Sequence, residues 1–357
     1  LSSQTVTSFR SQTKQSSYFA RSSFNYRNRY LLMLSFRYDG YSQFFPQNKY
    51  ASFPSASLGW NLANESFLRN VRFINLLKLR ASIGVTGSAG SQAYGTFSPD
   101  GNIITFNDGA VAYVPYLLTQ LDNPNLQWPK TVNKNLGLDF SLFGERVSGS
   151  FDIFRDDLTR LITNVNTAML SQISTEPVNS GHRVREGWEL GINTINIRKA
   201  SFEWSSFINF SHTRLHWEER FVNTFLRGWQ NEHDLVSSYY VFKTDGILDG
   251  VKAIPESQPA NARHPGSPIF VDRNGDNVID TMDVFRINPD AKLTIGFGNT
   301  FRYKGFDLGL MFYGQVGGKG TTPVAAWSTA ADFITGGQNG VRELNEIWTT
   351  ANPTGIR

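Results

Sequence analysis

The sequence has no cysteine, which excludes disulfide bonds, thiolate metal sites and a cysteine nucleophile. It also has no apolar run that approaches the roughly 20 residues of a transmembrane helix, so a helical membrane protein is excluded. Charged residues make up only 18% of the chain, and its formal net charge of +4 comes from scattered rather than clustered Lys and Arg. The sequence therefore gives no sign of a nucleic-acid surface, and we expect no nucleic-acid partner.

Signatures of catalysis are missing as well. The chain contains no GxSxG, HExxH or P-loop motif. The adjacent carboxylates Asp156 and Asp157 would point to opposite faces of a strand, which does not make an acid–base pair. His212 and His216 are four residues apart but fall at the end of a predicted strand, where helical spacing does not apply. We expect no enzyme activity, no organic cofactor and no metal at the histidines.

The chain does have many aromatic residues, at 14%, and long segments in which apolar and polar residues alternate. Between 76 and 87, for example, the apolar residues are Leu77, Leu79, Ala81, Ile83 and Val85, and the residues between them are Lys78, Arg80, Ser82, Gly84 and Thr86. A period of two predicts strands with one apolar and one polar face. About ten such strands are predicted, at 17–27, 29–40, 54–63, 75–86, 132–142, 146–157, 185–197, 201–213, 292–303 and 305–315.

The predicted strands are long. Each has roughly 9–14 residues, against a mean of about 5–6 in soluble sheets and about 9–11 in strands that cross a membrane. This length favours an all-β fold, an antiparallel transmembrane β-barrel whose apolar face meets lipid. The alternative is a soluble β-sandwich or propeller, but a sandwich would use shorter strands and a propeller would show a blade-length repeat.

The connections between the strands form two classes. Tight turns are predicted at 27–28, 143–145, 198–200 and 304–305, and 64–74 is intermediate in length. Long segments lie between the hairpins, at 41–53, 87–131, 158–184 and 214–291. Short connections at one end and long ones at the other are typical of periplasmic turns and extracellular loops in outer-membrane barrels. The long segments are also rich in aromatic residues, which favours either ligand capture at a barrel mouth or packing of the loops on themselves.

One loop has the spacing of a calcium site. Oxygen-bearing residues occupy positions 1, 3, 5, 9 and 12 of segment 272–283, and a backbone carbonyl is expected at position 7. The predicted calcium ligands are Asp272, Asn274, Asp276, Val278, Asp280 and Asp283. Two positions depart from the pattern, because Asn277 replaces the usual Gly and Asp283 replaces the longer Glu. The alternative is an Asx-rich turn that makes only local hydrogen bonds.

Several runs resemble successive barrel strands of the SusC/RagA group of TonB-dependent outer-membrane transporters. Their order and spacing match along nearly the whole chain, and the ordered set is far more specific than any one run. The runs are Arg29–Gly40, Phe53–Trp60, Leu77–Gly87, Asn123–Trp128, Asn135–Asp139, Asp152–Phe154, Glu186–Glu189, Phe270–Asp276 with Ile279 and Asp280, Gly298–Tyr303, and Phe306–Leu308.

The resemblance implies a barrel of about 22 strands closed by an N-terminal plug. It also implies TonB-coupled uptake, a SusD-like surface lipoprotein that covers the barrel, and oligosaccharide or peptide substrates. We interpret residues 1–357 as a middle-to-late barrel portion with extracellular loops at about 87–131, 158–184 and 214–291. TonB would act through an N-terminal part that precedes this chain, and pairing of two transporter–lipoprotein units is left open.

The sequence thus predicts an active nutrient importer that spans the outer membrane of a Gram-negative bacterium many times, in contact with membrane lipid. The alternative function is a receptor or adhesin barrel that binds a ligand without transporting it. Calcium at 272–283 would be structural, and the sequence identifies neither the substrate nor the residues that bind it.

Overall fold

A computed structural model describes residues 12–89, 93–99, 104–106, 111–113, 116–166, 175–250 and 253–319. The chain divides into two compact units. The first comprises residues 1–224 and 293–314, and the second comprises residues 225–292 and 315–357. The two units are described separately below.

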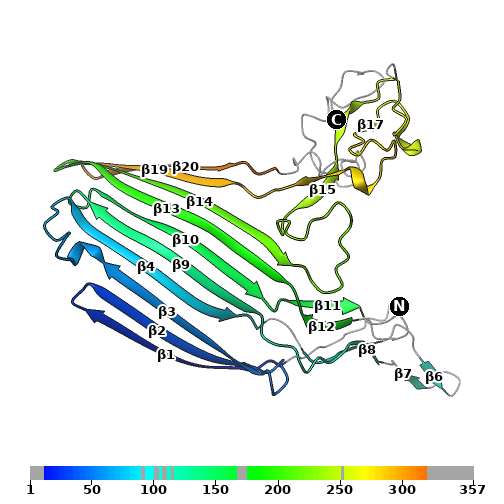
Figure 1. Cartoon of the computed structure of the whole chain (residues 1–357), viewed down its shortest axis with the longest axis horizontal. Helices are drawn as coiled ribbons and strands as arrows, with labels where there is room; N and C mark the ends of the chain where they lie inside the picture. Colours follow the sequence, from blue (N-terminus) through cyan, green and yellow to red (C-terminus); the bar gives the residue numbers. More distant parts are fainter. Residues whose placement is uncertain are drawn as a thin grey trace, which may run out of the picture. The chain divides into compact units, whose positions relative to one another are not determined.

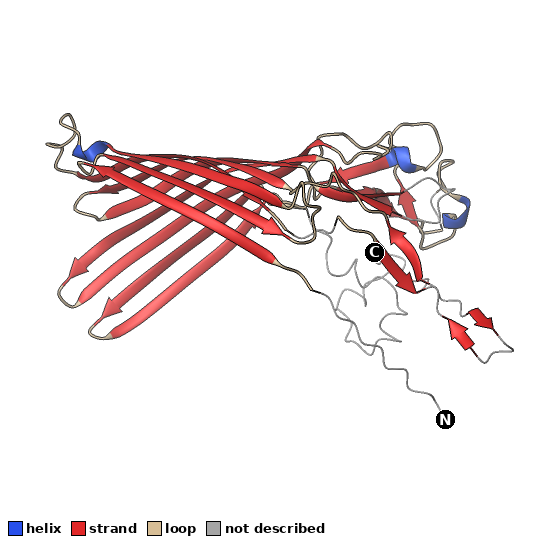
Figure 2. Cartoon of the chain, turned by 90° about the horizontal axis from the view of Figure 1, so that it is seen from below, coloured by secondary structure: helices blue, strands red, loops and turns tan. Residues whose placement is uncertain are grey.

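The first unit is built on a 10-stranded sheet whose strand order is β1-β2-β3-β4-β9-β10-β13-β14-β19-β20. Figure 1 shows the strands side by side, with every tight turn at the same end, and Figure 2 shows that the sheet is curved. All ten predicted strands are confirmed. They are β1 Gln15–Tyr26, β2 Tyr30–Tyr41, β3 Tyr50–Asn61, β4 Ile74–Gly87, β9 Lys130–Leu142, β10 Val147–Thr159, β13 His182–Lys199, β14 Phe202–Glu219, β19 Leu293–Tyr303 and β20 Phe306–Val316.

Tight turns fix the register of the hairpins. At the β1–β2 turn, Arg27 and Asn28 both have φ of 53°, and at the β19–β20 turn Lys304 and Gly305 have φ of 47° and 88°. Two successive residues with positive φ make the turn that matches the right-handed twist of paired strands. The β1–β2 pair runs without a break from Tyr26 opposite Tyr30 to Gln15 opposite Tyr41.

The observed register separates the residues into the two predicted faces. Residues opposite one another in an antiparallel pair point to the same face. Lys78 pairs with Asp139, and Leu79 pairs with Leu138, so the polar and the apolar faces stay continuous from strand to strand. Large apolar side chains on the apolar face are exposed, among them Leu58 at 60%, Ile83 at 51% and Leu136 at 56%. An exposed apolar band of this extent needs an apolar partner such as lipid.

Aromatic residues border the apolar face at both ends. Near the turns, Tyr26, Tyr30 and Trp60 stack in a row, with ring centroids 6.5 and 6.4 Å apart. Near the loops, Tyr18 lies opposite Tyr38. Eight residues separate Tyr18 from Tyr26, about 26 Å along a strand at about 3.3 Å per residue. Because strands in outer-membrane barrels are tilted by about 35–45°, this length corresponds to an apolar band about 20 Å tall, of the same order as the roughly 25 Å of such barrels.

The intermediate connection between β3 and β4 is anchored to the aromatic border. It begins with the 3-10 helix η1 (Leu62–Asn64) and continues into Glu65, which is only 8% exposed. Glu65 accepts hydrogen bonds from Trp60 Nε1 at 3.0 Å and Tyr30 Oη at 2.8 Å, and it forms an ion pair with Arg29 at 3.4 Å. The hydrogen bonds from Trp60 and Tyr30 hold the pKa of Glu65 below its usual value.

Two strands are longer than predicted, and the long connections contain strands that were not predicted. β13 and β14 have 18 residues each, because their pairing continues beyond the predicted segments through charged residues such as Arg183 and Arg214. A 4-stranded sheet of order β11-β12-β8-β5 and the β6–β7 pair form in the loops. Their strands are β5 Thr96–Pro99, β6 Ile104–Phe106, β7 Val111–Tyr113, β8 Tyr116–Gln120, β11 Ile162–Asn166 and β12 Thr175–Asn179.

The second unit contains two small antiparallel pairs, β15–β18 and β16–β17, and two 3-10 helices. Its elements are β15 Tyr239–Phe242, β16 Thr244–Ile247, η2 Ala260–Ala262, β17 Pro268–Phe270, η3 Thr281–Asp283 and β18 Val284–Ile287. Its buried residues include Leu248, Gln258 and Asp234. Among the residues that the structure describes, no helix is both long and apolar enough to cross a membrane.

Candidate functional site

Ion pairs cross the polar face of the sheet between β4, β9 and β10. Arg80 on β4 donates from Nε to Asp139 on β9 at 2.8 Å and from Nη2 to Asp152 on β10 at 3.1 Å. Lys78 lies 3.9 Å from the same Asp139 carboxylate. These side chains keep between 19% and 32% of their surface exposed. They give the polar face charged groups that are held in place yet accessible.

A glycine allows Arg80 to contact Asp152, which lies two strands away. Gly137 on β9 lies opposite Arg80 on one side and opposite Asp152 on the other. A Cβ at Gly137 would lie 2.7 Å from Arg80 Nη2 and 2.5 Å from Asp152 Oδ1. The guanidinium therefore crosses a whole strand through the space that the missing side chain leaves.

A second polar group lies nearer the loop end of the same face. Asp156 on β10 is 5% exposed. It accepts hydrogen bonds from Asn133 Nδ2 on β9 and from Arg185 Nε on β13, both at 2.8 Å. Carboxylates and cations thus alternate along the face, an arrangement that suits contact with water and with polar, hydrogen-bonding ligands.

An aromatic cluster packs at the loop end of the sheet. Its buried members are Phe44, Phe53, Ala93, Leu126 and Trp128. Trp128 is 7% exposed, stacks on Phe44 with centroids 5.4 Å apart, and meets Phe53 edge to face at 5.7 Å. The cluster joins the 42–49 loop, β3 and the segment before β9 into one packed body.

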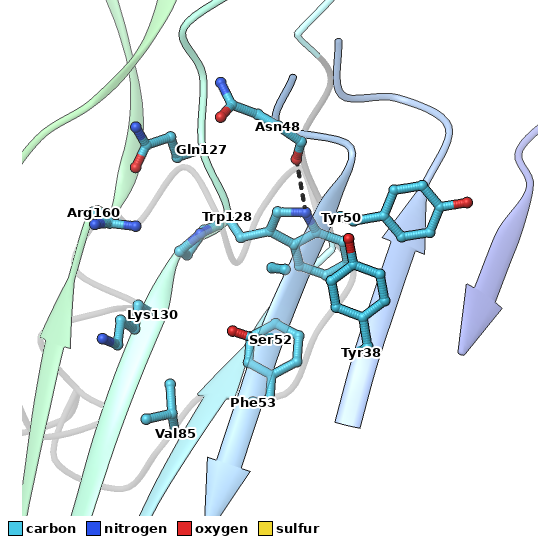
Figure 3. Close-up of a pocket in the computed structure, with 12 residues that line it drawn as sticks. Tyr38, Asn48, Tyr50, Ser52, Phe53, Val85, Gln127, Trp128, Lys130 and Arg160 are labelled. Carbon is cyan, nitrogen blue, oxygen red and sulfur yellow. Dashed lines mark hydrogen bonds between the residues drawn. The ribbon is translucent and has the colours of Figure 1, made fainter. Parts of the chain in front are cut away.

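Trp128 also forms the wall of a cavity, which is shown in Figure 3. Its indole Nε1 donates to the Asn48 carbonyl at 3.1 Å. The cavity has a volume of about 380 Å³ and is lined by Tyr38, Asn48, Tyr50, Ala51, Ser52, Phe53, Val85, Gln127, Trp128, Pro129, Lys130 and Arg160. In Figure 3, Gln127, Lys130 and Arg160 lie together on one side of Trp128, and Tyr38 lies on the other. The cavity therefore combines aromatic surface with amide and cationic donors.

None of the cavity residues was predicted as a site. The one sequence feature that could have indicated the cavity is the Asn123–Trp128 run, because this run ends at the tryptophan that forms the cavity wall. Hydrogen bonds hold this run between loops: Gln47 Nε2 donates to the Pro124 carbonyl at 2.7 Å, and the Gln127 amide donates to Asn179 Oδ1 at 2.6 Å.

Several aromatic residues of the long loops pack on one another. Phe45 and Tyr94 stack with centroids 4.4 Å apart, and Trp217 meets Phe221 edge to face at 5.0 Å. Others are open to solvent: Phe97 is 66% exposed and Phe225 is 94% exposed. The loops therefore pack on themselves in part, and ligand capture by the exposed aromatic residues stays a prediction.

The aspartate-rich loop is closed by its own hydrogen bonds. Asp272 accepts the Gly275 amide at 2.6 Å with Oδ1 and the Asn277 amide at 2.8 Å with Oδ2. Asp276 accepts the Val278 amide at 2.8 Å and the Asn274 side chain at 2.9 Å. Asn277 has φ of 65°, so it adopts the left-handed backbone that glycine usually supplies here.

The end of this loop is a capping box. Asp280 accepts the Met282 amide at 2.6 Å, and Asp283 accepts the Asp280 amide at 2.9 Å. Asp283 is fully buried and also accepts the Arg273 amide at 2.8 Å. Burial raises the pKa of Asp283, but the amides of Asp280, Arg273 and Asn274 outweigh it and hold the pKa below its usual value.

The six predicted calcium ligands lie in one loop, and the side-chain oxygens of all of them except Val278 accept hydrogen bonds from backbone amides of that loop. Across the described residues, no three His, Asp or Glu side chains are grouped so that they could hold a metal ion. The arrangement seen is that of an Asx-rich turn. Calcium binding by this loop remains a prediction.

The comparisons with known proteins agree with this architecture. Residues 2–333 match the family model for the TonB dependent receptor-like β-barrel. The TonB-dependent receptor P3 of Formosa agariphila is 30% identical over 97% of this chain and 35% of its own length. The TonB-dependent receptor SusC of Bacteroides thetaiotaomicron is 32% identical over 82% of this chain and 30% of its own length. The chain thus spans about a third of these relatives.

A solved structure shares the fold. The RagAB peptide transporter superposes with a TM-score of 0.68 at 19% identity, over 84% of this chain and 33% of that chain. The resemblance to the SusC/RagA group that the sequence indicated is therefore confirmed. The chain belongs to the TonB-dependent receptor-like β-barrel family, whose members are outer-membrane proteins of Gram-negative bacteria.

Proposed function

We propose that this chain forms part of the wall and outer mouth of an active importer in the outer membrane of a Gram-negative bacterium. The observation that carries the proposal is the two-faced sheet. One face exposes an apolar band between aromatic borders, and the other presents ion pairs such as Arg80–Asp139. Lipid satisfies the first face and a water-filled lumen satisfies the second.

The substrate class follows from the chemistry of the lumen and mouth. The polar face carries carboxylates and guanidinium groups, and the outer cavity adds the amide of Gln127 and the cations of Lys130 and Arg160 beside Trp128. These groups suit a polar oligomer that offers many hydrogen-bonding groups, an oligosaccharide or a peptide. RagAB, which shares the fold, is named a peptide transporter, and this agrees with the second of these two classes. The proposal assigns no catalytic step to the chain.

The proposed partners follow from the family. Energy for uptake would come from TonB acting on a plug, and a SusD-like surface lipoprotein would cover the mouth on the side of the long loops. Phe97 and Phe225, which are largely exposed, lie on these loops and offer apolar contact points. Such residues are typical anchors at protein–protein contacts.

Deletion of the full-length gene tests the proposal. Cells without the gene should fail to take up one labelled oligosaccharide or peptide from a panel, and the intact gene should restore uptake. Uptake should collapse when TonB is removed, while ligand still binds at the surface. Surface binding without TonB-dependent uptake of any candidate would instead establish the alternative, a receptor or adhesin barrel.

A further inference from the structure

The turn end of the sheet carries a row of exposed cations. Every hairpin of the 10-stranded sheet contributes at least one. We call the following set the cationic rim: Arg27 in the β1–β2 turn, Arg69 and Arg72 between β3 and β4, Arg146 after the β9–β10 turn, Lys199 before the β13–β14 turn, and Lys304 in the β19–β20 turn. All six side chains belong to exposed residues. Neighbouring hairpins are about 10 Å apart, because each adds two strands at about 4.8 Å spacing.

The residues that the structure describes do not neutralise the cationic rim. Within the described part of the chain, no ion pair involves any of its six members. The nearby acids are committed elsewhere: Glu65 pairs with Arg29, Glu203 pairs with Arg198 and Arg302, and Asp307 pairs with Arg302. Exposed Glu145 is the remaining acid on these turns among the residues described. The turn end is therefore a band of positive potential.

Adjacent aromatic residues indicate the depth of the rim. Arg27 directly follows Tyr26, and its guanidinium lies 5.1 Å from the centre of that ring. Lys304 directly follows Tyr303, with its ammonium 5.3 Å from the ring centre. Arg72 precedes Phe73, which is 50% exposed. Tyrosine and tryptophan borders lie at the level of lipid headgroups. The rim cations, one residue further out, lie level with the phosphates.

We propose that the cationic rim binds the phosphates of anionic phospholipids in the leaflet that the short turns enter. The proposal rests on the membrane placement given under the proposed function. Short turns face the periplasm in outer-membrane barrels, so this is the inner leaflet. A continuous row of cations matches a continuous layer of lipid phosphates, because each hairpin can take a lipid of its own. The rim would fix the depth of the barrel and enrich anionic lipid around it.

Lipid binding can be measured on the full-length transporter in nanodiscs of phosphatidylethanolamine with about a quarter phosphatidylglycerol. Native mass spectrometry counts the lipids that stay bound. The rim variant R27Q/R72Q/K199Q/K304Q removes four cations from the turns. The matched loop variant K14Q/R160Q/R227Q/K243Q removes two Arg and two Lys from the connections at the other strand ends. R27K/R72K/K199R/K304R keeps the charge and controls for folding.

We expect the rim variant to lower the bound ratio of phosphatidylglycerol to phosphatidylethanolamine by at least about fivefold, the effect of one cation near a membrane surface. The loop and charge-conserving variants should keep the wild-type ratio, and high salt should reduce it. An unchanged ratio in the rim variant, or an equal fall in the rim and loop variants, overturns the proposal. If the rim variant loses an acidic protein partner but keeps the wild-type lipid ratio, the proposal is also overturned. Wild-type protein that does not insert would refute the membrane placement itself.

Discussion

Arg80 on β4 binds Asp152 on β10 by passing over Gly137, the residue of β9 that lies between them. Ordinary cross-strand pairs link neighbouring strands, whereas this contact links strands two apart. It depends on the absence of a side chain at Gly137, where a Cβ would lie within 2.7 Å of the guanidinium. The Gly137 position and the Arg80–Asp152 ion pair should therefore behave as one unit.

A Gly137→Ala substitution should uncouple this pair. The added methyl displaces the ends of two flexible side chains, so the sheet should still form, but the Arg80–Asp152 coupling should vanish. A double-mutant cycle with R80Q and D152N, measured by urea unfolding of the full-length protein, should give a coupling of about 0.5–1 kcal/mol in the wild-type background. In the G137A background it should fall to near zero.

Gly309→Ala is the matched control for this cycle. Gly309 is also a strand glycine, on β20, and a Cβ there has open space around it. The coupling should survive G309A unchanged. A coupling that persists in G137A would show that Arg80 reaches Asp152 by another route.

The ten-stranded sheet was predictable because its signal repeats. Leu77, Leu79 and Ile83 alternate with polar residues over a whole strand, and a period of two over ten or more residues has no other common explanation. Turns with two positive-φ residues such as Arg27 and Asn28 then fix which strands pair. The short loop strands were not predictable, because β6 and β7 have only 3 residues each and so give no periodic signal.

The cavity beside Trp128 was not predictable for a different reason. Asn48, Gln127 and Arg160 come from three separate connections and meet only when β2, β3, β4, β9 and β10 pair in this order. Arg160 has φ of 54°, a backbone state that its residue type does not suggest. The calcium-like spacing at 272–283, by contrast, was visible in the sequence, but spacing alone does not determine whether the carboxylates bind an ion or backbone amides.

Trp128 should support the packing of the outer loops. Trp128→Ala removes a buried ring and should destabilise the aromatic cluster by about 3–5 kcal/mol. Trp128→Phe keeps most of the ring but loses the hydrogen bond to the Asn48 carbonyl, and should cost about 1 kcal/mol. Protease susceptibility of the 42–49 and 121–129 segments would measure both effects. Phe225→Ala, at a residue that is 94% exposed, is the control and should leave them unchanged.

The aspartate-rich loop gives a direct test of calcium. If calcium replaces the amide hydrogen bonds of Asp272 and Asp276, isothermal titration of the full-length protein should show a Kd of about 0.1–1 mM, the range of extracellular calcium modules. The D272N/D276N variant should abolish that heat, because it removes two of the charges on the site. Asp234→Asn, outside the loop, is the control. An absence of binding at millimolar calcium would mean that the loop is an Asx-rich turn alone.

Asp234 should make the segment around residues 231–240 sensitive to acid. Its buried carboxylate accepts hydrogen bonds from the Asn231 amide at 3.0 Å, from Tyr240 Oη and from Arg286. Burial raises the pKa of Asp234, but the hydrogen bonds from Tyr240, Asn231 and Arg286 outweigh it and lower the pKa below the ordinary 3.8. Because the folded pKa is depressed, the stabilisation is fully present above pH 3.8 and is lost as the pH falls through the folded value.

Hydrogen-exchange mass spectrometry of this segment, corrected for the intrinsic rate at each pH, should follow that loss. Protection should stay constant from neutral pH to about 4 and fall below it. In Asp234→Asn, protection should already be reduced at neutral pH, by about 1–2 kcal/mol, and should no longer change with acid. This loss of stability is smaller than for a fully buried ion pair, because the Arg286 side chain that pairs with Asp234 is 45% exposed. Equal acid sensitivity in the wild type and the variant would place the responsible carboxylate elsewhere in the protein.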